Sequence, residues 1–152
     1  AIANLDLHAV YPELDSERTL GETLLEPTRI YVEPIVKLLR QYKVKKVISG
    51  MAHITGGGIA GNLCRSICDK VDATVHLDRW SVPGVFSFLQ HHGTIETEEM
   101  FRVFNMGIGY ILIVRPSFAD SIMTHLQQLG ELPIVLGEIT RGSGNVHLIS
   151  GE

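Results

Sequence analysis

Three successive glycines, Gly56, Gly57 and Gly58, constrain this sequence more than any other feature, because they join an apolar run to the start of a helical pattern. Glycine adopts backbone angles closed to other residues, so the chain can turn sharply there and lie close to a ligand. The helix predicted from about Ile59 directs its free N–H groups and the positive end of its dipole at this loop. The combination predicts an anion site, most often for phosphate, and a plain glycine turn is the alternative.

Polar side chains flank the glycines. His53 and Thr55 precede them, and Asn62 and Arg65 follow about one and two helical turns later. Hydroxyl and guanidinium groups can donate to phosphate oxygens, and a histidine can donate a hydrogen bond or transfer a proton near neutral pH. Two of these residues also have a structural interpretation, His53 as a hydrogen-bonded core residue and Arg65 as a solvated surface charge.

Helical and strand patterns alternate from residue 28 onward. The predicted helices are 28–42 (with a kink or a later start at Pro34), 59–68, 84–92, 94 or 97 to 104, and 117–129. The predicted strands are 45–54, 73–77, 108–114, 132–139 and 145–149. This order predicts an α+β fold with a ferredoxin-like split βαβ core, in which helices cover a four- to five-stranded mixed sheet. An open parallel α/β sheet is the alternative.

Residues 1–27 differ from the rest of the chain. They carry six acidic residues and one arginine, prolines at positions 12 and 27, and no sustained apolar periodicity. We therefore predict an N-terminal arm or linker over residues 1–27 that leads out of, or packs against, another domain. Residues 28–152 are then the domain itself.

The composition excludes several classes of function. A chain of 152 residues is the size of one domain, and 13 basic against 17 acidic residues is a poor match to nucleic acid. The apolar runs fall short of the roughly 20 residues that cross a bilayer, so no membrane partner is expected. Cys64 and Cys68 lie one helical turn apart, which suits reduced core thiols better than a disulfide and indicates a cytoplasmic protein.

Four segments together resemble the C-terminal half of the aminoimidazole ribonucleotide synthetases, also called phosphoribosylformylglycinamidine cyclo-ligases. They are L-G-E-T-L-L-E-P-T-R-I-Y-V (Leu20–Val32), G-M-A-H-I-T-G-G-G-I (Gly50–Ile59), W-S-V-P-G-V-F (Trp80–Phe86) and E-E-M-F-R-V-F-N-M-G-I-G (Glu98–Gly109). The resemblance implies ATP- and Mg²⁺-dependent closure of formylglycinamidine ribonucleotide to an imidazole in purine synthesis. It also implies an N-terminal ATP-binding domain that is absent from this chain, and a homodimer in the full-length protein.

The resemblance also implies roles for individual residues. In that family the γ-phosphoryl group of ATP passes to the formyl oxygen, and an internal nitrogen then displaces phosphate, which depends on positioning and on stabilising phosphoryl charge. It makes His53 the catalytic candidate. The phosphate- or substrate-binding candidates are Thr55, Gly56, Gly57, Gly58, Asn62, Arg65, Asn105 and Arg29. Asn62 and Arg65 match the family's N-x-x-R, whereas Gly61 and Cys64 depart from its usual residues.

Two other classes remain open at this point. One is another ATP-using enzyme of the same superfamily, such as formylglycinamidine synthase or a maturation enzyme, although those relatives tend to have aspartate where this chain has His53. The other is a non-catalytic ferredoxin-like module that binds a small ligand. No carboxylate cluster in the sequence is suited to Mg²⁺, so no metal ligand is predicted and we expect the chain alone to be inactive.

Overall fold

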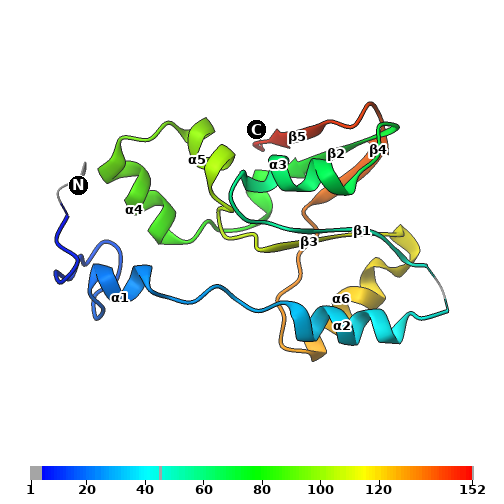
Figure 1. The fold of residues 1–152 in the computed structure, drawn as a ribbon, viewed down its shortest axis with the longest axis horizontal. Coiled ribbons are helices and arrows are strands. Elements are labelled where there is room, and N and C mark those ends of the chain that lie inside the picture. The colour runs from blue at the N-terminus through cyan, green and yellow to red at the C-terminus, as the bar shows by residue number, and fades with distance from the viewer. Residues whose placement is uncertain (1–4, 45, 152) are drawn as a thin grey trace.

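The computed structural model describes residues 5–44 and 46–151, and these form helices and strands in an α+β arrangement, as predicted (Figure 1). The α-helices are α1 (Leu20–Leu24), α2 (Val32–Gln41), α3 (Gly58–Leu63), α4 (Gly84–Gly93), α5 (Thr97–Val103) and α6 (Ala119–Gln128). The 3₁₀ turns are η1 (Cys64–Ser66), η2 (Leu77–Arg79) and η3 (Pro116–Phe118). The strands are β1 (Ile48–His53), β2 (Val71–His76), β3 (Tyr110–Val114), β4 (Gly137–Arg141) and β5 (Val146–Ile149).

The five strands form two sheets, instead of the single four- to five-stranded sheet that we predicted. Strand β1 pairs antiparallel with β3, while β2 lies between β4, which is antiparallel to it, and β5, which is parallel. A strand has two edges, and both edges of β2 are occupied by β4 and β5, so β1 cannot pair with β2. The antiparallel pairs also exclude an open parallel sheet.

The β1–β3 sheet is the middle layer of the domain. Side chains alternate along each strand, so one face of the sheet packs against α2 and α6 and the other against α3 and the second sheet (Figure 1). The buried residues of the first face are Leu38, Val47, Ile122 and Leu126. Those of the second face are Ala52, Ile54, Ile59, Leu63, Ala73, Val75, Ile108 and Ile111.

Several elements are shorter than predicted, for local reasons. Pro34 sits in the first turn of α2, where its missing N–H costs little, so the helix starts late and is not kinked. Helix α3 gives way to η1 and then to extended backbone at Ile67. The fourth strand runs from Gly137 to Arg141, so the predicted range of 132–139 begins too early.

The segment before residue 28 packs against α4 in this structure. Thr19 and Glu22 form a capping box that starts α1, and Leu20 is buried. The ring of Tyr11 meets that of Phe88 edge-on at 5.2 Å between centroids. An extended stretch then leads from α1 to α2 (Figure 1). Its assignment as the linker to a further domain stays a prediction.

The two cysteines are not core residues. Cys64 and Cys68 are free and exposed, so the predicted pair of buried thiols is wrong. Helix α3 ends before Cys68 and turns both side chains away from the sheets. In the described part of the chain, no helix is long and apolar enough to cross a membrane.

Candidate functional site

The glycine loop connects β1 to α3 through a tight turn. Beyond the end of β1, Ile54 continues the strand pairing by donating its N–H to the Gly109 carbonyl at 2.9 Å. The Gly58 N–H then donates to the Thr55 carbonyl at 3.2 Å. Gly57 has φ +96° and Gly58 has φ +64°, values that side chains disfavour. The sequence prediction of a strand, a glycine turn and a helix start is therefore confirmed.

Asn62 braces this loop from within the helix. Its side chain is buried, and its amide nitrogen lies 3.3 Å from the carbonyl oxygen of Thr55, 3.2 Å from that of Gly56 and 2.7 Å from that of Gly58. The side-chain amide of Asn62 thus donates to the loop carbonyl oxygens, and this gives Asn62 a role in holding the loop. The loop conformation is thus fixed by its own helix before any ligand arrives.

The outer surface of the loop is open. A Cβ at Gly56 would have no neighbour within 4 Å, and Thr55, Gly56 and Gly57 are exposed. Within the described chain, the N–H group of Ala60 in the first turn of α3 has no hydrogen-bond acceptor, and Ala60 is partly exposed, whereas Ile59 is buried. Unpaired first-turn donors beside an exposed glycine backbone are the usual elements of an anion site.

Helix α5 and the turn after it press against the inner side of the loop. A Cβ at Gly58 would lie 2.0 Å from the carbonyl oxygen of Phe101 and 3.2 Å from that of Phe104. Only glycine permits this approach of two backbones. Gly58 is therefore required by packing, whereas Gly56 is free to face a ligand.

The turn at residues 104–109 also meets the other two segments on which the family resemblance rests. The Trp80 indole N–H donates to the Met106 carbonyl at 2.9 Å, and a Cβ at Gly107 would collide with the Pro83 ring at 2.5 Å. The Tyr31 hydroxyl fills the space where a Cβ of Gly109 would stand. All four sequence segments thus converge on one turn behind the glycine loop.

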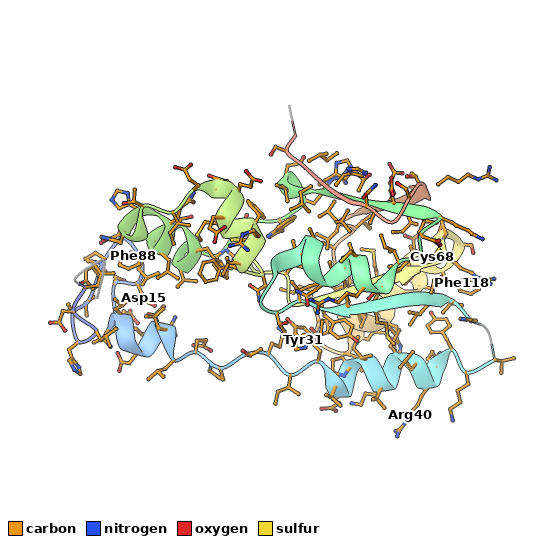
Figure 2. All side chains as sticks on the ribbon, turned by 45° about the horizontal axis from the view of Figure 1, so that its top comes forward. Asp15, Tyr31, Arg40, Cys68, Phe88 and Phe118 are labelled. Carbon is orange, nitrogen blue, oxygen red and sulfur yellow. The ribbon has the colours of Figure 1, made fainter. Side chains whose placement is uncertain are left out.

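His53 lies in a group of aromatic rings at the end of β1. It is exposed, which rules out the core-histidine alternative, and it stands opposite Tyr110 on β3 with ring centroids 6.0 Å apart. Tyr31 contacts both rings, at 6.0 Å from His53 and 5.5 Å from Tyr110. Burial raises the pKa of the Tyr31 hydroxyl, so this group stays protonated at neutral pH. Figure 2 shows Tyr31 between the segment entering α2 and the β1–β3 layer.

Three other predicted site residues lie differently. Arg65 is exposed in η1, where the rise of a helix puts its backbone roughly 10 Å along the axis from the loop. Arg29 donates to the Gly130 carbonyl and pairs with Glu131 at 3.1 Å, beyond the end of α6. Asn105 accepts the Gly107 N–H at 3.0 Å, which stabilises the turn behind the loop. The structure thus brings His53, Thr55, the glycines and Asn62 together, with Asn105 just behind them.

Sequence reasoning missed Tyr31 and Tyr110 as neighbours of His53. The pairing of His53 with Tyr110 depends on the register of β1 against β3, which local sequence does not determine. Tyr31 stands in the resemblance segment T-R-I-Y-V, and that was the only available signal. Among the described residues no three His, Cys, Asp or Glu side chains cluster as a metal site.

Comparison with known proteins shows which family of proteins this chain matches. The family model described as AIR synthase related protein, C-terminal domain, matches residues 3–149. The chain is similar to the phosphoribosylformylglycinamidine cyclo-ligase of Alkaliphilus metalliredigens, with 49% identity over 130 residues, covering 86% of this chain and 36% of the relative. The enzymes of the same name from Desulfitobacterium hafniense and Bacillus subtilis are 46% and 42% identical, covering 90% and 93% of this chain. The chain covers 38% and 39% of those relatives, so it spans well under half of their length.

Proposed function

Because this chain belongs to the AIR synthase related protein family, as a C-terminal domain, we propose that it is the phosphate- and substrate-binding part of an ATP-dependent cyclo-ligase. The reaction would close formylglycinamidine ribonucleotide to aminoimidazole ribonucleotide in purine synthesis. The larger part of the relatives lies outside this chain. ATP binding, the homodimer and a cytoplasmic location are accordingly part of the proposal for the longer protein.

One observation carries the assignment of the site: the open outer face of the glycine loop beside the unpaired N–H group of Ala60. An anionic oxygen at this face would accept this hydrogen bond and meet the positive end of the helix. The exposed Thr55 hydroxyl is close enough in sequence to add a donor. A phosphate of the substrate or of ATP has the required charge and oxygens.

His53 is proposed as the group that exchanges a proton or a hydrogen bond with the reacting formyl oxygen. Its imidazole is exposed two residues before Thr55, and Tyr31 and Tyr110 hold one side of the ring. A ring fixed in this way needs little reorganisation to meet a bound substrate. Arg65 and Arg29 are retained only as sources of longer-range positive charge, because neither side chain reaches the loop.

Magnesium does not fit this chain alone. Its described residues bring no three carboxylate or imidazole groups together, so no step of the proposal runs through a metal held here. We therefore propose that the ligands for Mg²⁺, which would neutralise the charge of ATP, belong to the rest of the protein. On this basis the isolated chain should not release ADP from ATP.

The test is a phosphate titration of the isolated chain followed by amide NMR shifts. We expect residues 55–60 to shift first. The variant Gly56→Val should abolish the shifts without unfolding the domain, because the position has open space and an ordinary φ. Gly57→Val is a poorer test, since its φ of +96° would strain the backbone whatever the ligand.

Gly84→Val is the matched control, because Gly84 also has open space but begins a different helix. It should bind phosphate as the parent chain does. If residues 55–60 stay silent at saturating phosphate, or if Gly56→Val binds normally, the loop is only a turn and the proposal fails.

A further inference from the structure

Helix α2 carries more apolar surface than its contacts use. Successive helical residues are about 100° apart, so the apolar side chains of α2 span an arc of roughly 200°. One half of this arc, around Pro34 and Leu38, is buried against α6 and the β1–β3 sheet. The other half consists of Val32, Val36 and Leu39, spaced four and three residues apart on one line. The remaining face holds the polar residues Glu33, Lys37, Arg40 and Gln41.

The second half of the arc faces solvent. Val32 is 69% exposed, Val36 38% and Leu39 40%. Leu25 and Ile30, on the stretch before the helix, are also exposed, at 82% and 78%. We call Val32, Val36 and Leu39 the α2 surface. Figure 2 shows Arg40, on the polar face, extending away from the rest of the chain.

Two ion pairs lie near the α2 surface. Glu33 pairs with Lys37 at 2.6 Å, and Arg29 pairs with Glu131 at 3.1 Å. Such a surface suits the apolar face of another folded domain better than a polyanion or a charged peptide.

We propose that the α2 surface is the docking site of the N-terminal part that the relatives carry and this chain does not. The chain spans 36% of the Alkaliphilus metalliredigens relative, and the matched family domain is the C-terminal one, so the larger part of such a protein precedes it. The α2 surface lies on the first long helix of the domain, directly after the stretch that leads into it. This inference rests on family membership and does not depend on phosphate binding by the glycine loop.

The experiment compares the isolated chain with a chimera in which the N-terminal part of the Alkaliphilus metalliredigens relative precedes it. Both are prepared with Cys64 and Cys68 replaced by serine, since these thiols are exposed and would react. A single cysteine is then introduced by Val36→Cys and its rate of alkylation is measured. The matched control is Ile139→Cys on β4, because Ile139 is 39% exposed, nearly the same as Val36.

In the isolated chain we expect the two cysteines to react at similar rates. In the chimera, Val36→Cys should react at least about ten times more slowly, while Ile139→Cys keeps its rate. Equal rates for Val36→Cys in the two proteins would overturn the proposal. Protection of Val36→Cys that grows with the concentration of the isolated chain would also overturn it, in favour of a second copy as the occupant.

A second variant tests whether the protection comes from contact at the α2 surface, in a chimera that first protects a cysteine placed at Leu39. The variant is Val36→Asp, which puts a charge on this surface, and a melt of the isolated chain checks that its fold is kept. In the chimera the same change should restore the alkylation of a cysteine placed at Leu39. Continued protection of that cysteine would show that the α2 surface is not the site of contact.

Discussion

The three glycines of the loop predict three different responses to the same substitution. Each would gain one methyl group on changing to alanine, but the structure places the three methyl groups in different surroundings. At Gly56 the methyl meets nothing within 4 Å and φ is ordinary. At Gly57 the space is also open, but φ is +96°. At Gly58 φ is +64° and the methyl would lie 2.0 Å from the Phe101 carbonyl oxygen.

The expected changes in the free energy of unfolding follow from these surroundings. Gly56→Ala should be neutral or stabilise by about 0.4–1 kcal/mol, because alanine restricts the unfolded chain. Gly57→Ala should destabilise by about 1–2 kcal/mol, the cost of a left-handed backbone for an L-residue. Gly58→Ala adds about 1–3 kcal/mol of overpacking to a similar backbone cost, for a total of about 2–5 kcal/mol.

Urea unfolding followed by circular dichroism measures all three. With a slope of about 1–3 kcal/mol per molar urea, Gly58→Ala should lower the midpoint by about 0.7 M or more. Phosphate is left out of the buffer so that ligand binding does not contribute. Equal stability of the Gly58→Ala and Gly56→Ala proteins would refute the close contact between the loop and α5.

Three further predictions test neighbouring contacts. Asn62→Asp should destabilise by about 1–3 kcal/mol in urea unfolding, because a carboxylate would replace the amide donor among three carbonyl oxygens; an unchanged midpoint would contradict the brace. Tyr31→Phe should preserve the NMR shifts of the His53 ring protons and Tyr31→Leu should not, since the ring and not the hydroxyl makes the contact; equal shifts in both would contradict it. Hydrogen bonds from the Asn145 and Ser143 N–H groups lower the pKa of Asp72, so its stabilisation is complete above the ordinary pKa of about 4 and is lost as the pH falls through the lowered pKa. Below about pH 5, the melting temperature of Asp72→Asn should therefore vary less with pH than that of the parent. An identical variation would show that Asp72 does not contribute to the pH dependence of stability.

Features that depend on a few consecutive residues were predictable from the sequence. The glycine loop lies between a strand and a helix because glycine angles and the helix start are local properties. The helix before Gly93 and the one before Gly130 were also located to within a few residues. Gly130 has φ +83°, the left-handed conformation that commonly ends a helix.

Features that depend on distant partners were not predictable. Whether β2 pairs with β1 or with β4 and β5 is decided by packing across the whole domain, and the residue pattern of β2 is compatible with either. The role of Asn62 depended on where its amide points, since N-x-x-R spacing alone suggested a ligand group. Arg65 was named with Asn62 because of its charge and the N-x-x-R match, and the direction of its side chain cannot be read from that spacing.

The turn at residues 104–109 has a consequence for the order in which the chain folds. It receives Trp80 from 26 residues earlier in the chain and Tyr31 from much further back, and its Gly109 carbonyl closes the end of β1. Each contact closes a long stretch of chain, which is entropically costly until the flanking strands have paired. We therefore expect the contacts between the glycine loop and this turn to form after β1 has joined β3, whereas the Asn62 brace is local and can form with α3 itself. A chain with this turn unformed would keep the brace but lack the support that Phe101 and Phe104 give to the inner side of the loop.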